Sequence, residues 1–96
     1  NTAASNAELI NNICEPAEVP VICGEKGVCE GCGIATLTID YYELGQITGE
    51  MAVDILENGA DVSQMAVRQA EQVKKCYVPE RCEKLGISIP DDYDEL

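Results

Sequence analysis

Apolar positions along the chain follow two different spacings, which separate the predicted strands from the predicted helices. The run from Ile34 to Ile39 is rich in β-forming residues, as expected of a strand. It passes without a loop into a segment whose apolar residues recur every three or four positions, and this predicts one long amphipathic helix that ends near Asn58, with Gly59 as its stop. The apolar face of this helix comprises Leu44, Ile47, Met51, Ile55 and Leu56.

The junction between this strand and this helix is a polar, aromatic corner. Asp40 followed by Glu43 has the spacing of a capping box, in which two side chains satisfy the first backbone N–H groups of a helix. Gly45 and Gly49 lie one helical turn apart, where a missing Cβ allows a neighbour to approach closely. Corners at the end of a strand are where α/β folds hold ligands.

The rest of the chain predicts shorter elements. Ser5 and Glu8 have the spacing of a second capping box, at the start of the first helix. The acidic tail from Ser88 to Leu96 is expected to be mobile or draped over the surface. The remaining predictions are a first helix that ends before Pro16, a strand over 19–23, a loop or short helical turn over 24–33, a short strand over 65–67, a strand over 73–78, and a last helix from Pro79 to a terminal Gly86.

The alternation of strands and helices predicts the α/β class, with an open, mainly parallel sheet flanked by helices. A parallel sheet needs several strands covered on both faces, and this sequence offers three or four. The sequence also opens on a helix, with no preceding strand for that helix to cover. We therefore expect these residues to be part of a larger fold.

Composition narrows the function. The 96 residues carry a net charge of −12 and contain no His, which disfavours binding to nucleic acid or to anionic membrane surfaces and removes the commonest general base. No apolar run approaches the roughly 20 residues of a membrane span, and no signal segment precedes Asn1. No paired carboxylates and no nucleophile beside a base are present, so we expect no enzyme activity.

Six cysteines leave a second interpretation open. Cys23, Cys29 and Cys32 have the spacing C-x5-C-x2-C, which resembles the cluster loop of [2Fe–2S] ferredoxins, with Cys76 as a fourth ligand. The alternative is that these cysteines are small buried hydrophobes or pair as disulfides in an exported protein. A ferredoxin of that kind has a β-hairpin before the loop, whereas here a helix and one strand are predicted. An electron carrier is therefore the alternative function, and the preferred one requires neither cofactor nor metal.

Several segments occur in an order that resembles a known family. They are Asn1-Thr2-Ala3-Ala4-Ser5, Val19-Pro20-Val21-Ile22, Gly24-Glu25-Lys26-Gly27-Val28, Gly33 to Gly45 (GIATLTIDYYELG), Thr48-Gly49-Glu50-Met51-Ala52 and Lys84 to Pro90 (KLGISIP). This series resembles the C-terminal third of ABC-transporter substrate-binding proteins of the tryptophan/tyrosine-uptake type, which have the two-lobed type I periplasmic-binding-protein fold. The resemblance covers nearly the whole chain.

The resemblance implies a domain organisation and a biological context. Residues 1–40 and about 65–96 would form part of the C-terminal lobe, and the helix of about 41–60 would belong to the N-terminal lobe, with the turn at residue 40 as a crossing between lobes. The protein would be extracytoplasmic, either periplasmic or lipid-anchored, with its signal segment outside these 96 residues. Its partners would be a membrane permease and a small organic ligand: an amino acid, with an aromatic one as the narrower expectation.

The resemblance also assigns roles at the cleft, each beside a plainer alternative. Asp40 would hold the ligand's ammonium group, although helix capping alone accounts for a carboxylate there. Tyr41 would cover the ligand side chain while Tyr42 packs. Asn1 and Thr2 would donate to the ligand's carboxylate, or simply begin the first helix.

Two further positions are assigned to the ligand site. Glu25 lies in a glycine-flanked loop, where a solvated charge is the plainer interpretation. Gly33 would permit close approach of the backbone, or form an ordinary turn. Because the sheet would be incomplete, we also expect its exposed strand edges to promote self-association.

Overall fold

The computed structural model describes residues 2–96 and divides into two compact units. The first unit contains residues 1–38 and 74–96, and the second contains residues 39–73. The elements of the first part of the chain are α1 (Thr2–Ser5), α2 (Ala7–Cys14), β1 (Ile22–Cys23), α3 (Lys26–Cys32) and β2 (Ala35–Ile39). Those of the second part are α4 (Tyr41–Leu56), a 3₁₀ turn η1 (Val62–Gln64), β3 (Val73–Tyr77), α5 (Pro79–Leu85) and β4 (Asp94–Glu95).

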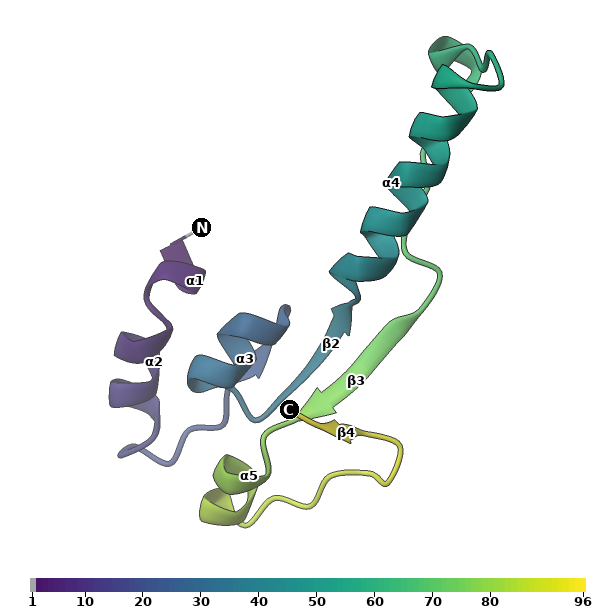
Figure 1. Cartoon of the computed structure of the whole chain (residues 1–96). Helices are drawn as coiled ribbons and strands as arrows, with labels where there is room; N and C mark the ends of the chain where they lie inside the picture. The colour runs from purple at the N-terminus through teal and green to yellow at the C-terminus, as the bar shows by residue number, and fades with distance from the viewer. Residues whose placement is uncertain (1) are drawn as a thin grey trace. The chain divides into compact units, whose positions relative to one another are not determined.

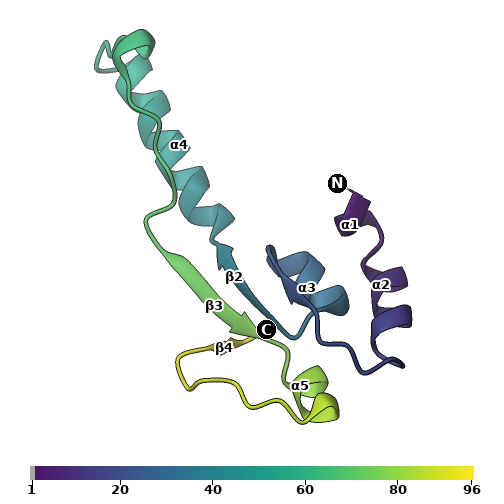
Figure 2. The same ribbon diagram turned by 180° about the vertical axis from the view of Figure 1, so that it is seen from behind.

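The strands form one sheet in the order β1-β2-β3-β4. The β1 and β2 pair is parallel, with Ile22 opposite Ala35, and the β3 and β4 pair is parallel, with Cys76 opposite Asp94. The arrows of β2 and β3 point in opposite directions in both views (Figures 1 and 2). Two of the three pairings are therefore parallel, which confirms the predicted α/β fold with an open, mainly parallel sheet.

Capping side chains, proline and glycine determine where helices of the first unit begin and end. Glu25 caps α3 by accepting from two backbone N–H groups, and Pro79 starts α5 at a position where its missing N–H costs nothing. Gly86 ends α5 with φ of 66°, a left-handed conformation that glycine adopts without strain. The capping box predicted at Ser5 is wrong, because Ser5 lies inside α1 and Asn6 precedes α2.

Two small apolar clusters form the core of the first unit. One contains Cys23, Cys29 and Cys32 and lies between β1, α2 and α3; the other contains Ile34, Ala35 and Cys82. In both views α2 and α3 lie side by side. Cysteines supply much of the buried apolar surface, so the core consists largely of small side chains.

The C-terminal tail differs from its prediction. Residues 94 and 95 form β4 beside β3, and the Leu96 N–H donates to the Tyr77 carbonyl at 2.9 Å. An ion pair between Lys75 and Asp92 anchors the loop that leads into β4. The end of the acidic tail therefore belongs to the sheet, and the expectation that the tail is only mobile or draped over the surface is wrong for residues 94 and 95.

The second unit consists mainly of α4. Asp40 caps this helix by accepting from the Tyr42 N–H at 2.9 Å, as predicted, whereas the Glu43 carboxylate accepts from the Glu71 N–H at 3.0 Å. A Cβ built at Gly45 or Gly49 meets no atom within 4 Å, so the predicted close neighbour is absent from the described residues. The short strand predicted over 65–67 does not form, and the strand predicted over 19–23 is reduced to Ile22–Cys23. No helix within residues 2–96 combines the length and apolarity that crossing a bilayer requires.

Candidate functional site

A pocket of about 380 Å³ lies at the carboxyl end of β1. Residues from α1, α2, β1, the following loop and α3 line it: Ala3, Ile10, Val21, Ile22, Cys23, Gly24, Glu25, Val28 and Cys32. Ligands of open α/β sheets bind outside the carboxyl ends of the strands, which is where this pocket lies. Its lining is mainly apolar with one carboxylate, the usual character of a small-molecule site.

Glu25 provides the charge in this pocket. Its two carboxylate oxygens accept from the Gly27 N–H at 2.9 Å and from the Val28 N–H at 3.1 Å. These backbone hydrogen bonds lower the pKa of Glu25 below its usual value, so the side chain is anionic at neutral pH. Because each carboxylate oxygen has two lone pairs, Glu25 can cap α3 and still accept from a ligand.

The residues at the start of the chain lie beside the same pocket. Asn1 falls outside the described residues. Thr2 is the exposed first residue of α1, its carbonyl accepts from Asn6 Nδ2 at 2.6 Å, and its neighbour Ala3 lines the pocket. The structure thus brings α1 and the Glu25 loop together at one end of β1, although they are more than twenty residues apart in sequence.

Gly33 has a different environment. It is buried at the opposite end of α3 and does not line the pocket. A Cβ at this position would lie 2.5 Å from the Cys23 sulfur and 3.0 Å from the Cys29 sulfur. Gly33 therefore permits the close approach that was predicted, and the atoms that approach belong to the protein core.

Asp40 and Tyr41 begin the second unit. Asp40 immediately follows β2 and caps α4, so its plainer predicted role is confirmed. Tyr41 is 62% exposed and Tyr42 is 75% exposed. Both aromatic rings are thus available for contacts, and the prediction that one of them packs is wrong within this chain.

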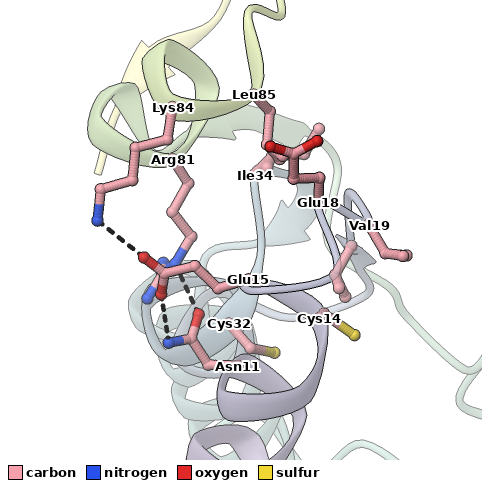
Figure 3. Close-up of a pocket in the computed structure, with 11 residues that line it drawn as sticks. Asn11, Cys14, Glu15, Glu18, Val19, Cys32, Ile34, Arg81, Lys84 and Leu85 are labelled. Atoms are coloured by element: carbon pink, nitrogen blue, oxygen red, sulfur yellow. Dashed lines mark hydrogen bonds and ion pairs between the residues drawn. The ribbon is translucent and has the colours of Figure 1, made fainter.

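A second pocket, of about 230 Å³, lies at the amino ends of β1 and β2 (Figure 3). Its lining includes Val21 and Ile34, which directly precede the two strands, and the charged side chains of Glu15, Arg81 and Lys84. Lys84 pairs with Glu15 at 2.8 Å, and this hydrogen bond raises the pKa of Lys84 and lowers that of Glu15. The pocket lies at the wrong end of the strands for an α/β ligand site.

Arg81 organises this second pocket and was missed by sequence reasoning. Its guanidinium donates to the carbonyls of Cys29, Glu30, Gly31 and Gly33 at 3.0 to 3.3 Å, and to Asn11 Oδ1 at 3.1 Å. These carbonyls include the last ones of α3, which have no partner inside the helix. Arg81 is thus committed to capping α3, and no local sequence signal predicts a partner some fifty residues away.

The cysteines are packed as hydrophobic core residues. The exposed fraction is 8% for Cys23, 0% for Cys29 and 3% for Cys32, and all six cysteines are unpaired thiols. Within residues 2–96, no group of three or more His, Cys, Asp or Glu side chains is placed to hold a metal ion. The arrangement therefore favours the interpretation as small buried hydrophobes over the iron–sulfur one.

Comparison with known proteins identifies the family. The sequence profile described as ABC transporter substrate binding protein matches residues 1–94. The chain belongs to this family. The family membership gives no support to the ferredoxin alternative, since the matching profile describes a substrate-binding protein and spans residues 1–94.

Relatives within and near the family show which proteins this chain is similar to. It is 27% identical over 74 residues to a tyrosine-binding protein of Clostridioides difficile strain R20291, a match that spans 77% of this chain and 21% of that protein. A ligand-free, open substrate-binding protein with adhesive properties from Clostridium difficile is 32% identical, with a TM-score of 0.79 over 98% of this chain and 32% of that one. An ABC domain from Streptococcus pneumoniae in complex with L-Trp is 26% identical, with a TM-score of 0.82 over 99% of this chain and 34% of that one.

The chain spans about a third of the length of these solved structures and about a fifth of the tyrosine-binding protein. The fold of these relatives is that of periplasmic binding proteins, in agreement with the resemblance found in the sequence. The two units of this chain therefore correspond to a portion of a substrate-binding protein.

Proposed function

We propose that the chain is the C-terminal part of an extracytoplasmic solute-binding component of an ABC importer, and that the protein binds an amino acid, in particular an aromatic one. The observation that carries this proposal is similarity over nearly the whole chain to a domain in complex with L-Trp, together with a curated relative that binds tyrosine. Substrate-binding proteins of ABC transporters typically act outside the cytoplasm and deliver their ligand to a membrane permease. The function is binding rather than catalysis.

The proposed mechanism is closure of two lobes on the ligand by a hinge movement. Residues 1–40 and about 65–96 belong to the C-terminal lobe, and the helix of about 41–60 belongs to the N-terminal lobe. The division of the chain into two compact units supports the first of these boundaries, since one unit ends at residue 38, whereas the second unit extends to residue 73, beyond the proposed boundary near 65. The closed form then docks on the permease.

Asp40 accepts the ligand's ammonium group, and Tyr41 stacks on its side chain. Asn1 and Thr2 donate to its carboxylate, while Glu25 borders the site; Gly33 packs against the core cysteines and is not part of the proposed site. The pocket at the carboxyl end of β1 supports this arrangement, because it lies next to Thr2 and includes Glu25. The exposed ring of Tyr41 supports the stacking role, since an exposed aromatic ring offers a large apolar face to a ligand.

Calorimetric titration of the two-lobed protein with each of the twenty amino acids tests the ligand class. Tyrosine or tryptophan should bind, with the apolar side-chain burial giving a negative heat-capacity change. Tyr41→Ala should weaken binding at least tenfold, whereas the matched variant Tyr42→Ala on the neighbouring exposed ring should have little effect. A folded protein that binds none of the twenty would overturn the proposal.

The 96-residue chain on its own should bind these ligands weakly, because it contains mainly the residues that line one side of the cleft. We also propose that it self-associates, since the edge strand β1 exposes Ile22 to 71%. Sedimentation velocity over a range of concentrations tests this. A strictly monomeric species at all concentrations would contradict it.

A further inference from the structure

Three thiols, those of Cys23, Cys29 and Cys32, lie together on one side of α3. The proposed binding of an amino acid in the pocket at the carboxyl end of β1 gives these thiols no function. Cys23 ends β1, and Cys29 and Cys32 lie one turn apart on the face of α3 that packs against it. The position where Gly33 would have a Cβ lies 2.5 Å from the Cys23 sulfur and 3.0 Å from the Cys29 sulfur. A missing side chain therefore leaves room for these two sulfurs to approach one another.

The third thiol is held differently. The Cys32 sulfur donates to the Val28 carbonyl at 3.3 Å, along the axis of its own helix. The Cys23 thiol interacts with both Cys32 and Cys29. The Cys29 sulfur is not engaged with a carbonyl in this way among the described residues, and it lies with that of Cys23 against Gly33. Cys23 and Cys29 are thus the pair that the geometry favours.

Access to this pair is asymmetric. Cys23 and Cys32 line the pocket of about 380 Å³ at the carboxyl end of β1, whereas Cys29 is fully buried and does not line it. A small reagent that enters the pocket therefore meets Cys23 before Cys29. We propose that Cys23 and Cys29 are a redox-active pair, which a small-molecule disulfide such as oxidised glutathione converts into an intramolecular disulfide.

The chemistry balances as two successive thiol–disulfide exchanges. The Cys23 thiolate attacks one sulfur of oxidised glutathione, forms a mixed disulfide and releases one glutathione, which takes up the proton that Cys23 lost. The Cys29 thiolate then attacks the Cys23 sulfur and expels the second glutathione, which takes up the second proton. Two protein thiols lose two electrons, and one glutathione disulfide is reduced to two thiols.

Burial sets the speed of this reaction. Desolvation raises the pKa of Cys23 to about 12 and that of Cys29 to about 11, so both thiols are protonated at neutral pH. Since only the thiolate attacks, the rate of oxidation should rise about tenfold for each pH unit while the thiolate remains a minor species.

The disulfide would also affect the candidate ligand site. Residues 24–28, between the two cysteines, include Gly24, Glu25 and Val28 of the pocket lining. A disulfide between Cys23 and Cys29 would link the two ends of this segment covalently and restrict its movement. The redox pair itself does not depend on the proposed amino-acid ligand, and its test requires no ligand.

The test is oxidation of the folded 96-residue chain by glutathione disulfide at about pH 8, followed by acid quenching, alkylation and tryptic mass spectrometry. Trypsin cleaves after Lys26 and so separates the two cysteines into peptides 1–26 and 27–68. In a Cys14→Ser, Cys32→Ser background each of these peptides retains one cysteine, so a linked peptide pair reports the Cys23–Cys29 bond alone. We expect that linked pair and the loss of two hydrogen atoms from the intact chain.

Single variants show whether the fold selects the pair. Cys29→Ser should stop the reaction at the mixed disulfide of Cys23 with glutathione, and Cys29→Ala provides a second variant if the serine is not tolerated in the core. Cys14→Ser is the matched control, since Cys14 lines the other pocket, and it should oxidise like the parent chain. Predominant linkage of Cys23 to Cys32 in the parent, or a mixed disulfide that never resolves, would overturn the proposal.

Discussion

The two compact units of this chain are stabilised in different ways. The first, residues 1–38 and 74–96, buries two apolar clusters and joins segments far apart in sequence through Arg81. In the second, residues 39–73, all of which are described, only Ile47 is buried. Leu56 at the end of its helix is 82% exposed, although it belongs to the predicted apolar face.

The comparison shows that an amphipathic pattern specifies a helix but does not supply its packing partner. Helix stability in proteins comes mostly from tertiary packing of the apolar face. The first unit contains such packing within these 96 residues. The second has the pattern with little cover, since only Ile47 of its apolar face is buried, as expected if α4 packs in another lobe. Three matched pairs of substitutions and one pH series separate the two situations, beginning with the largest expected effect.

Arg81→Ala should destabilise the chain most. It removes charge-assisted hydrogen bonds to four carbonyls around the end of α3 and leaves half-buried acceptors without a donor, at a cost of about 3 kcal/mol in the free energy of unfolding. The matched change in the second unit is Arg68→Ala, which removes an exposed ion pair with Glu50 and should cost less than about 1 kcal/mol. Urea unfolding measures both, and equal losses would remove the distinction between the units.

Gly33→Ala should have the next largest effect on the free energy of unfolding. Its Cβ would overlap the Cys23 sulfur and the Cys29 backbone, and overpacking of this kind costs about 2 kcal/mol. Gly49→Ala in α4 meets open space and should instead stabilise the chain by about 0.5 to 1 kcal/mol through helix propensity. Thermal unfolding of the two variants should therefore shift in opposite directions, and shifts of the same sign would show that the two glycines are equivalent.

Thr36→Val should have a smaller effect of opposite sign. The Thr36 hydroxyl is buried and has no hydrogen-bond partner within residues 2–96, so an isosteric methyl group should raise the free energy of unfolding by about 1 kcal/mol. Thr48 in α4 is exposed and donates to the Leu44 carbonyl at 2.8 Å. Thr48→Val should change stability by no more than about 0.5 kcal/mol. A destabilised Thr36→Val variant would indicate that the hydroxyl has a partner after all.

The change of stability with pH should be the smallest of these effects near neutral pH. Because burial raises the pKa of Cys23 and Cys29 above the usual value of 9.0, the unfolded chain ionises first as the pH rises. Stability is therefore complete below about pH 9 and falls towards about pH 11. Chemical denaturation across this range should show the decline, and a Cys23→Ala, Cys29→Ala variant should flatten it. The second unit contains no cysteine, so an unchanged slope in that variant would assign the effect elsewhere.

Sequence reasoning was most successful where the signal is local. The strand before Asp40, the long helix after it and the last helix between Pro79 and Gly86 all occur close to their predicted bounds. Each depends on periodicity and caps within a few residues. The strand predicted over 65–67 failed, and β4 was missed, because the stability of a short strand depends on backbone partners that lie elsewhere in the sequence.

At the candidate site, too, local sequence predicted some features, whereas tertiary contacts determined others. Glu25 was predicted in a glycine-flanked loop, but its geometry as the cap of α3 and a wall of the pocket required the packing of α1, α2 and α3 around β1. Arg81 has no local sequence signal, since four of its five acceptors are backbone carbonyls that any residue could provide and the fifth, Asn11, is seventy residues away. Which cysteines can form a disulfide likewise depends on which sulfurs the fold places next to Gly33.

The amino-acid sequence by itself determined the α/β class, the bounds of the main helices and the family, because these follow from side-chain periodicity and from ordered motifs along one chain. Only the tertiary structure decided that the tail joins the sheet, that Arg81 caps α3 and that Cys23 and Cys29 converge. These features arise from contacts between residues distant in sequence, whose formation depends on how packed elements are oriented and not on any local pattern.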